Sequence, residues 1–140
     1  MKQKEAYIEI AQRYIASAKQ HQSQGINIQE VIGFLAYHAL ESIAVAVIVH
    51  FKSSIPMNHE TKLRMFLGLC QKNFANLVNA KNLATVIIRV EKNGYRSKFL
   101  YPYLQGENNY KSPQEQISLA EAGLLVRDVD RIIDRIISLI

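Results

Sequence analysis

The sequence predicts an all-α protein: a four- to five-helix up-and-down bundle with an apolar central helix. Apolar residues recur at three- and four-residue spacings along most of the chain, which is the period of one helix face. Residues 31–51 are apolar at nearly every position, as in a helix that is surrounded by neighbours. With 140 residues the chain has the usual size of one domain, so we expect a single domain over residues 1–140.

The first predicted helix covers residues 2–21 and gathers its apolar side chains on one stripe. That stripe consists of Tyr7, Ala11, Tyr14, Ile15 and Ala18. A second helix should begin near Ile28, because Asn27 and Glu30 have the three-residue spacing of a capping box.

The apolar stretch 31–51 is expected to form the core of the bundle. Its exceptions are Tyr37, His38, Glu41, Ser42 and His50. The stretch is long enough to span a bilayer, but Glu41 at mid-membrane would cost about 3 kcal/mol. We therefore expect a buried core helix, no membrane association, and a helix end before Pro56.

A third helix is predicted to begin near Asn58, and a further stripe continues to about Glu91. The pattern leaves open whether Lys72 and Asn73 separate two helices. Gly94 then ends the helical pattern, because glycine readily adopts the left-handed conformation of a helix terminus. The two stripes are Leu63, Phe66, Leu67 and Cys70, then Phe74, Leu77, Val78, Leu83 and Ile87.

Residues 101–111 are predicted to be a loop, since they contain Pro102 and Gly106. Ser112, Pro113 and Glu115 then combine three signals for the start of the last helix. Its inward face should hold Ile117, Ala120, Leu124, Val129, Ile132, Ile133, Ile136 and Ile137. Exposed charge pairs are expected for Arg127 with Asp130, Asp128 with Arg131, and Arg131 with Asp134.

Positive charge is concentrated in the middle of the chain. Residues 52–111 carry ten Lys and Arg against three acids, a local net charge of +7 within a total of +5. Such a surface attracts the phosphates of RNA, although a solvated face that maintains solubility has the same composition. The single cysteine, Cys70, excludes an internal disulfide, and no apolar secretory stretch follows Met1, so a cytoplasmic location is expected.

Residues 93–103 combine two cations with three tyrosines around a helix end. Arg96 offers a planar fork of donors for phosphate oxygens, and Lys98 adds a second charge. Tyr101 and Tyr103 have rings that can stack on bases. Alternatively, Tyr95 and the other tyrosines cover the core while the cations are solvated. The predicted ligand- or nucleic-acid-binding set is Arg96, Lys98, Tyr101 and Tyr103.

Here the chain resembles a family, the HEPN domains (higher eukaryotes and prokaryotes nucleotide-binding). Their motif of Arg, four residues, His, one residue and Tyr is matched in spacing by Arg96 and Tyr103. The resemblance implies a helical bundle, association with nucleotide or RNA, and a homodimer. Three further segments look alike: Tyr14-Ile15-Ala16, Tyr37-His38-Ala39, and His59-Glu60 through Phe66.

The chain departs from the motif at Tyr101, where nuclease members have the histidine. In those members the resemblance implies metal-independent cleavage of RNA, with dimerisation pairing two sets of Arg and His. A phenol is a poor substitute for an imidazole, which exchanges protons near neutral pH. We therefore expect little or no cleavage, and Arg96, Tyr101 and Tyr103 are the catalytic candidates if a ribonuclease activity remains.

Some HEPN members are toxins that a partner nucleotidyltransferase neutralises by modifying the motif tyrosine. The resemblance therefore implies a toxin–antitoxin-type component in which Tyr103 or Tyr101 is the acceptor. The alternative function is a non-catalytic helical interaction or oligomerisation module whose apolar residues serve assembly.

Histidines and acids suggest two further hypotheses. His38 and Glu41 lie on one face of the central helix and form either a buried acid–base pair or a polar contact in the core. We expect His59 to be exposed, with Lys62 and Arg64 extending the basic surface. We expect no metal and no cofactor, because His21, His38, His50 and His59 have no compact ligand spacing.

Overall fold

The computed structural model describes every residue of the chain except Leu77, so that member of the predicted stripe lies outside the described residues. The described chain contains seven helices and one short hairpin, and five of the helices are long. The prediction of an all-α helical bundle is confirmed. The elements are α1 (Gln3–Ser23), α2 (Gln29–His50), α3 (His59–Asn73), α4 (Ala80–Lys92), α5 (Tyr95–Leu100), β1 (Tyr103–Leu104), β2 (Tyr110–Lys111), α6 (Pro113–Gln116) and α7 (Leu119–Ile137).

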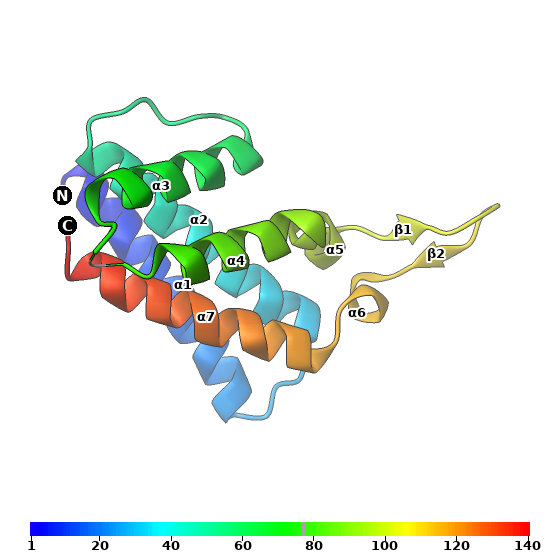
Figure 1. The fold of residues 1–140 in the computed structure, drawn as a ribbon. Coiled ribbons are helices and arrows are strands. Elements are labelled where there is room, and N and C mark those ends of the chain that lie inside the picture. Colours follow the sequence, from blue (N-terminus) through cyan, green and yellow to red (C-terminus); the bar gives the residue numbers. More distant parts are fainter. Residues whose placement is uncertain (77) are drawn as a thin grey trace.

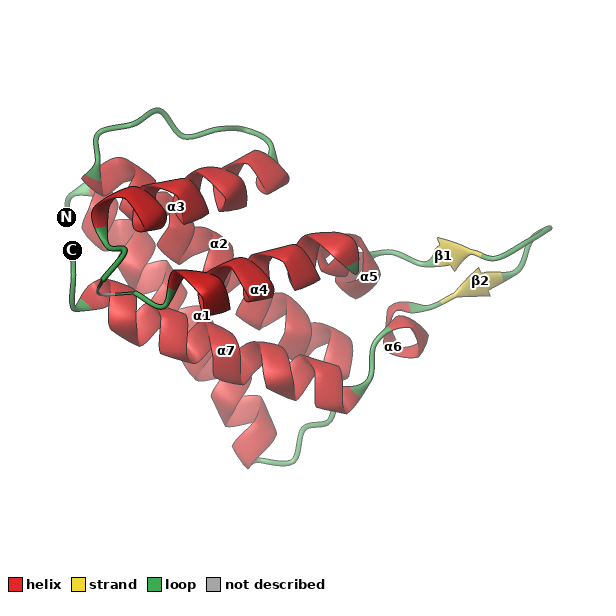
Figure 2. Ribbon diagram, in the orientation of Figure 1, coloured by secondary structure: helices red, strands yellow, loops and turns green. Residues whose placement is uncertain are grey.

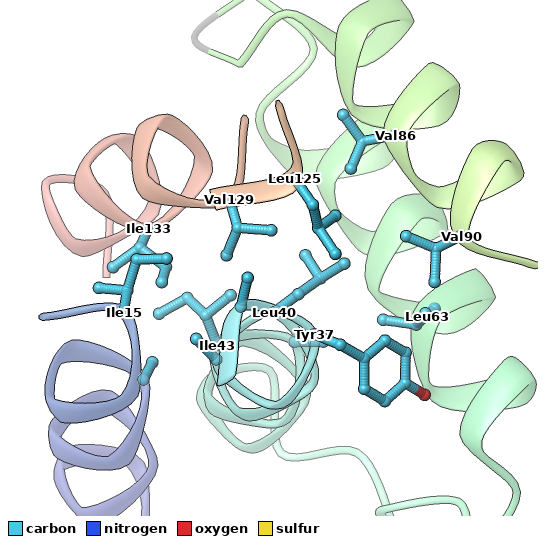
Figure 3. Close-up of a cluster of buried hydrophobic side chains, with 14 of the residues drawn as sticks. Ile15, Tyr37, Leu40, Ile43, Leu63, Val86, Val90, Leu125, Val129 and Ile133 are labelled. Atoms are coloured by element: carbon cyan, nitrogen blue, oxygen red, sulfur yellow. The ribbon is translucent and has the colours of Figure 1, made fainter. Parts of the chain in front are cut away.

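Helix α2 lies at the centre of the bundle, and α1, α3 and α7 surround it (Figure 1). Every side chain from Ala39 to Ile48 is buried. Figure 3 shows Leu40 and Ile43 of α2 pointing toward Val129 and Ile133 of α7. By length and composition α2 could also cross a membrane, but 78% of its most apolar window is buried against the rest of the bundle.

The last helix closes the bundle through ion pairs with distant helices. Asp128 accepts from Arg89 of α4 at 2.8 Å, and Asp130 accepts from Lys19 of α1 at 3.1 Å. These acids therefore serve contacts between helices, whereas the sequence predicted pairs along the surface of α7. The two chain ends are adjacent, because Lys4 Nζ donates to the carbonyl of Ile140 at 2.9 Å.

The predicted last helix is interrupted. Glu115 accepts from the backbone and hydroxyl of Ser112, as predicted, but α6 ends after one turn because Ile117 is extended. A second capping box then starts α7: Glu121 N donates to the Ser118 hydroxyl at 3.1 Å. Ala120 follows this start and is exposed, which corrects its predicted inward position.

The starts of α2 and α3 show which predicted helix caps are present in the structure. Asn58 caps α3 by accepting from Thr61 N at 3.1 Å, as expected. The predicted capping box of Asn27 and Glu30 is wrong: Ile28 is the N-cap residue of α2 and no side chain caps it. The open question about Lys72 and Asn73 is answered, since α3 ends at Asn73 and α4 begins at Ala80.

Candidate functional site

The short helix α5, which the sequence did not predict, positions the candidate residues. Gly94, with φ of +59°, ends α4 and redirects the chain into α5. Tyr95 and Phe99 are buried with ring centroids 5.3 Å apart. The Phe99 ring packs so closely on Gly33 of α2 that a Cβ there would lie 2.5 Å from it. This contact fixes α5 against the core.

The three tyrosines of this region have different roles. Tyr95 donates to Glu121 Oε2 at 3.1 Å, and burial together with this carboxylate raises the pKa of Tyr95. Tyr95 therefore covers the core, which was one of the two alternatives. Tyr101 and Tyr103 are 54% and 60% exposed, so their rings are accessible.

Helix α5 separates two clefts. The Arg96 cleft, of about 330 Å³, is lined by α2, α3, α4 and α5 and contains Tyr37, His59, Glu91 and Arg96. The hairpin cleft, of about 430 Å³, contains Asn93, Lys98, Tyr101, Pro102, Tyr103, Gln105, Lys111, Glu115 and Gln116. Gly94 and Ser97 line both clefts.

The four predicted binding residues are thus divided between these clefts. Lys98, Tyr101 and Tyr103 come together, whereas Arg96 faces the neighbouring cleft. Residues two apart on a helix point in directions about 200° apart, which explains the separation of Arg96 from Lys98. The sequence spacing placed all four in one segment but gave no indication that this segment is helical.

A small antiparallel hairpin forms part of the predicted loop 101–111. Tyr103 pairs with Lys111 and Leu104 with Tyr110, and the hairpin extends away from the bundle (Figure 2). Gln116 of α6 holds its base by donating to the carbonyls of Tyr101 and Lys111 at 2.8 and 3.2 Å. This pairing brings Lys111 to the cleft of Lys98, a proximity that the sequence analysis missed.

Behind the Arg96 cleft lies a buried charge network centred on Glu41. Its carboxylate accepts from His59 Nδ1 at 2.8 Å and from Lys62 Nζ at 3.1 Å. Burial alone would raise the pKa of Glu41, but the hydrogen bonds from Lys62 and His59 hold it below its usual value. Glu41 is therefore ionised at neutral pH.

This network corrects two hypotheses from the sequence. His38 does not bond Glu41; its ring lies 4.5 Å from the Tyr14 ring and 5.9 Å from that of Phe34, and burial lowers the pKa of His38. The expected basic surface also loses Lys62, whose side chain is only 16% exposed. His59 keeps 40% of its side-chain exposure while bonded to Glu41.

The acids of the Arg96 cleft are occupied by a different arginine. Arg64 lies 3.3 Å from Glu91 and 3.7 Å from Glu60. No described residue forms a hydrogen bond or ion pair with Arg96, whose charge acts on the Tyr37 phenol. Glu91 Oε1 is buried without a partner among the described residues, while Glu91 Oε2 pairs with Arg64. The cleft therefore offers an unpaired guanidinium to a ligand.

Among the described residues no group of three or more His, Cys, Asp and Glu is placed to hold a metal ion. Cys70 is buried, and burial raises the pKa of its thiol to about 12, so it packs as an apolar side chain.

No family model matches this chain, and no curated protein or solved structure is significantly similar to it. The family resemblance therefore depends on the residues quoted above.

Proposed function

We propose that this protein is a HEPN-like component that binds a nucleotide or single-stranded RNA, with Arg96 holding a phosphate. The observation that carries the proposal is the unpaired Arg96 guanidinium in a cleft whose two lining carboxylates, Glu60 and Glu91, both pair with Arg64. A planar guanidinium binds phosphate oxygens through two parallel hydrogen bonds. A phosphate there would not compete with an existing ion pair of Arg96.

The hairpin cleft supports the same proposal for a longer ligand. Lys98 and Lys111 provide charge for a second phosphate, and the exposed rings of Tyr101 and Tyr103 provide stacking surfaces for bases. Because Gly94 and Ser97 line both clefts, a strand can pass over α5 from one cleft to the other.

The position of Tyr101 bears on the nuclease motif. Tyr101 lies in the hairpin cleft and Arg96 in the other, so within one chain the two motif positions do not share a cleft. The exposure of Tyr103 is what modification by a partner nucleotidyltransferase would require. We therefore include in the proposal a toxin–antitoxin-type role in the cytoplasm.

An interaction module is the second candidate, and the hairpin favours it. Leu104 and Tyr110 are more than half exposed on an arm that projects from the bundle. Large apolar side chains in such a position are typical of contact surfaces, and they support pairing of two copies into a homodimer. Light scattering of the protein and of a Leu104→Asp variant tests this: the variant should be the smaller species.

Fluorescence anisotropy with labelled single-stranded RNA and with labelled ATP, across a salt series, tests the binding proposal. We expect affinity to fall steeply with salt and Arg96→Ala to bind at least ~10-fold more weakly. Arg13→Ala, on the exposed face of α1, is the matched control and should bind like the unchanged protein. Equal binding by both variants, or none by the folded protein at low salt, would contradict the proposal.

A further inference from the structure

His59 is held in a defined orientation at the edge of the Arg96 cleft. Its Nδ1 is 2.8 Å from Glu41 Oε2, and an ionised carboxylate can only accept, so Nδ1 carries the hydrogen. In the neutral ring Nε2 then has a free lone pair. No described residue bonds to Nε2, and the side chain lines the same cleft as Arg96.

Glu41 is suited to support a proton transfer by His59. It is buried, and the hydrogen bond from Lys62 helps to keep it ionised. A carboxylate bound to one ring nitrogen fixes the tautomer and stabilises the imidazolium that forms when the other nitrogen takes a proton. The cleft thus joins an oriented base to an unpaired phosphate-binding cation.

From this geometry we infer that His59, positioned by Glu41, is the proton acceptor of a metal-independent RNA cleavage in the Arg96 cleft. His59 would supply the imidazole that is absent at Tyr101. This inference rests on the proposed binding of RNA by Arg96. It differs from the motif-based expectation, in which a phenol at position 101 leaves the site without a proton acceptor.

The reaction is an internal phosphoryl transfer. His59 Nε2 takes the proton of a ribose 2′-hydroxyl, the 2′-oxygen bonds to the adjacent phosphorus, and the bond from phosphorus to the 5′-oxygen breaks. The departing oxygen takes a proton from water, and the resulting hydroxide is neutralised by the proton that His59 releases. Arg96 stabilises the charge on the non-bridging oxygens. The products are a 2′,3′-cyclic phosphate and a 5′-hydroxyl.

The test uses single-stranded RNA and the same sequence as DNA, both in EDTA and under single-turnover conditions. The RNA should be cleaved to cyclic phosphate ends, and the DNA should remain intact because it lacks the attacking hydroxyl. His59→Gln should slow cleavage ~100-fold or more while RNA binding and helical circular dichroism stay unchanged. His21→Gln, on α1, is the matched control and should cleave at the original rate.

A second readout tests the positioning role of Glu41. Loss of its carboxylate removes the acceptor that holds the hydrogen on Nδ1, so the cleavage rate at saturating RNA should fall while the RNA concentration that gives half the maximal rate stays unchanged. We compare Lys62→Met with Glu41→Gln/Lys62→Met, because the paired change leaves no unmatched buried charge. An unchanged rate at saturating RNA would overturn the role of Glu41. The charged and titratable groups around His59 are Tyr37, His38, Glu41, Glu60, Lys62, Glu91 and Arg96.

The possible outcomes distinguish the cleavage inference from the binding proposal. Arg96-dependent binding of RNA without cleavage, or equal rates for the unchanged protein and His59→Gln, overturns this inference and leaves the binding proposal intact. Absence of RNA binding overturns both.

Discussion

The two clefts beside α5 are built in different ways. The Arg96 cleft has walls from four helices, and His59 in its lining is bonded to the buried Glu41 of the central helix. The hairpin cleft is formed by a projecting arm that two strand pairs, a backbone hydrogen bond from Gln105 to Asn109 and the Gln116 side chain hold together. Residues of the first cleft are therefore tied to the stability of the bundle, whereas residues of the second can change with little effect on folding.

The largest loss of stability should come from the Glu41 network next to the Arg96 cleft. Glu41→Gln leaves Lys62 charged and largely buried, so we expect the free energy of unfolding to fall by about 3 kcal/mol. Urea denaturation measures this, and adding Lys62→Met should recover much of the loss because the unmatched charge is removed. A fall of less than about 0.5 kcal/mol for Glu41→Gln would remove the contrast between the clefts.

The second-largest loss of stability should come from disturbing the contact that attaches α5 to α2. Gly33→Ala places a methyl group against the buried Phe99 ring, and overpacking of this kind costs about 1–3 kcal/mol. Gly68→Ala on α3 is the matched control, since its Cβ meets nothing within 4 Å. That control should be neutral or slightly stabilising, because alanine favours a helix over glycine. Gly33→Ala should also weaken binding that depends on Arg96, since α5 carries that residue.

Acid should destabilise the bundle in two separable stages. Burial lowers the pKa of His38 in the folded protein, so stability is lost as pH falls below ~6.5, where the unfolded chain binds protons first. The lowered pKa of Glu41 contributes stability above ~4.5 that is lost only as pH falls through its folded value. Melting temperatures of His38→Gln between pH 7 and 5 should decline less than those of the unchanged protein.

The smallest effect on stability should come from the hairpin. Lys111→Ala removes an exposed side chain, so we expect a change in unfolding free energy within about 0.5 kcal/mol. If Lys111 contacts a phosphate, the salt dependence of RNA binding should decrease by a slope of about 1. Lys81→Ala, exposed on α4 outside both clefts, should leave that slope unchanged.

Capping signals between residues three positions apart predicted where helices begin. The geometry of the candidate site, in contrast, depends on contacts between residues that are far apart in the sequence. Asn58 and Ser112 start helices where expected because their partners lie three residues away. Ser118 and Glu121 carry the same three-residue signal, but a start at Ser112 already accounts for the apolar pattern that follows.

The side-chain partners of the site could not be found in this way. Glu41 binds residues 18 and 21 positions along the chain, and Asp128 binds Arg89, 39 positions away. Three- and four-residue spacing gives no information about such pairs. The rotation of α5 about its own axis places Arg96 and Lys98 in different clefts. This rotation likewise depends on how Phe99 packs against Gly33.

Because α5 forms a wall of both clefts, ligand binding in one cleft should affect ligand binding in the other. A ligand bound to Arg96 tilts or immobilises the six-residue helix that also carries Lys98. If α5 has one preferred orientation with either cleft filled, the two binding events are cooperative, and each raises the affinity of the other by the same factor. A mononucleotide bound in one cleft would then raise the affinity of the other cleft for a second phosphate, because α5 is too short to bend independently at its two faces.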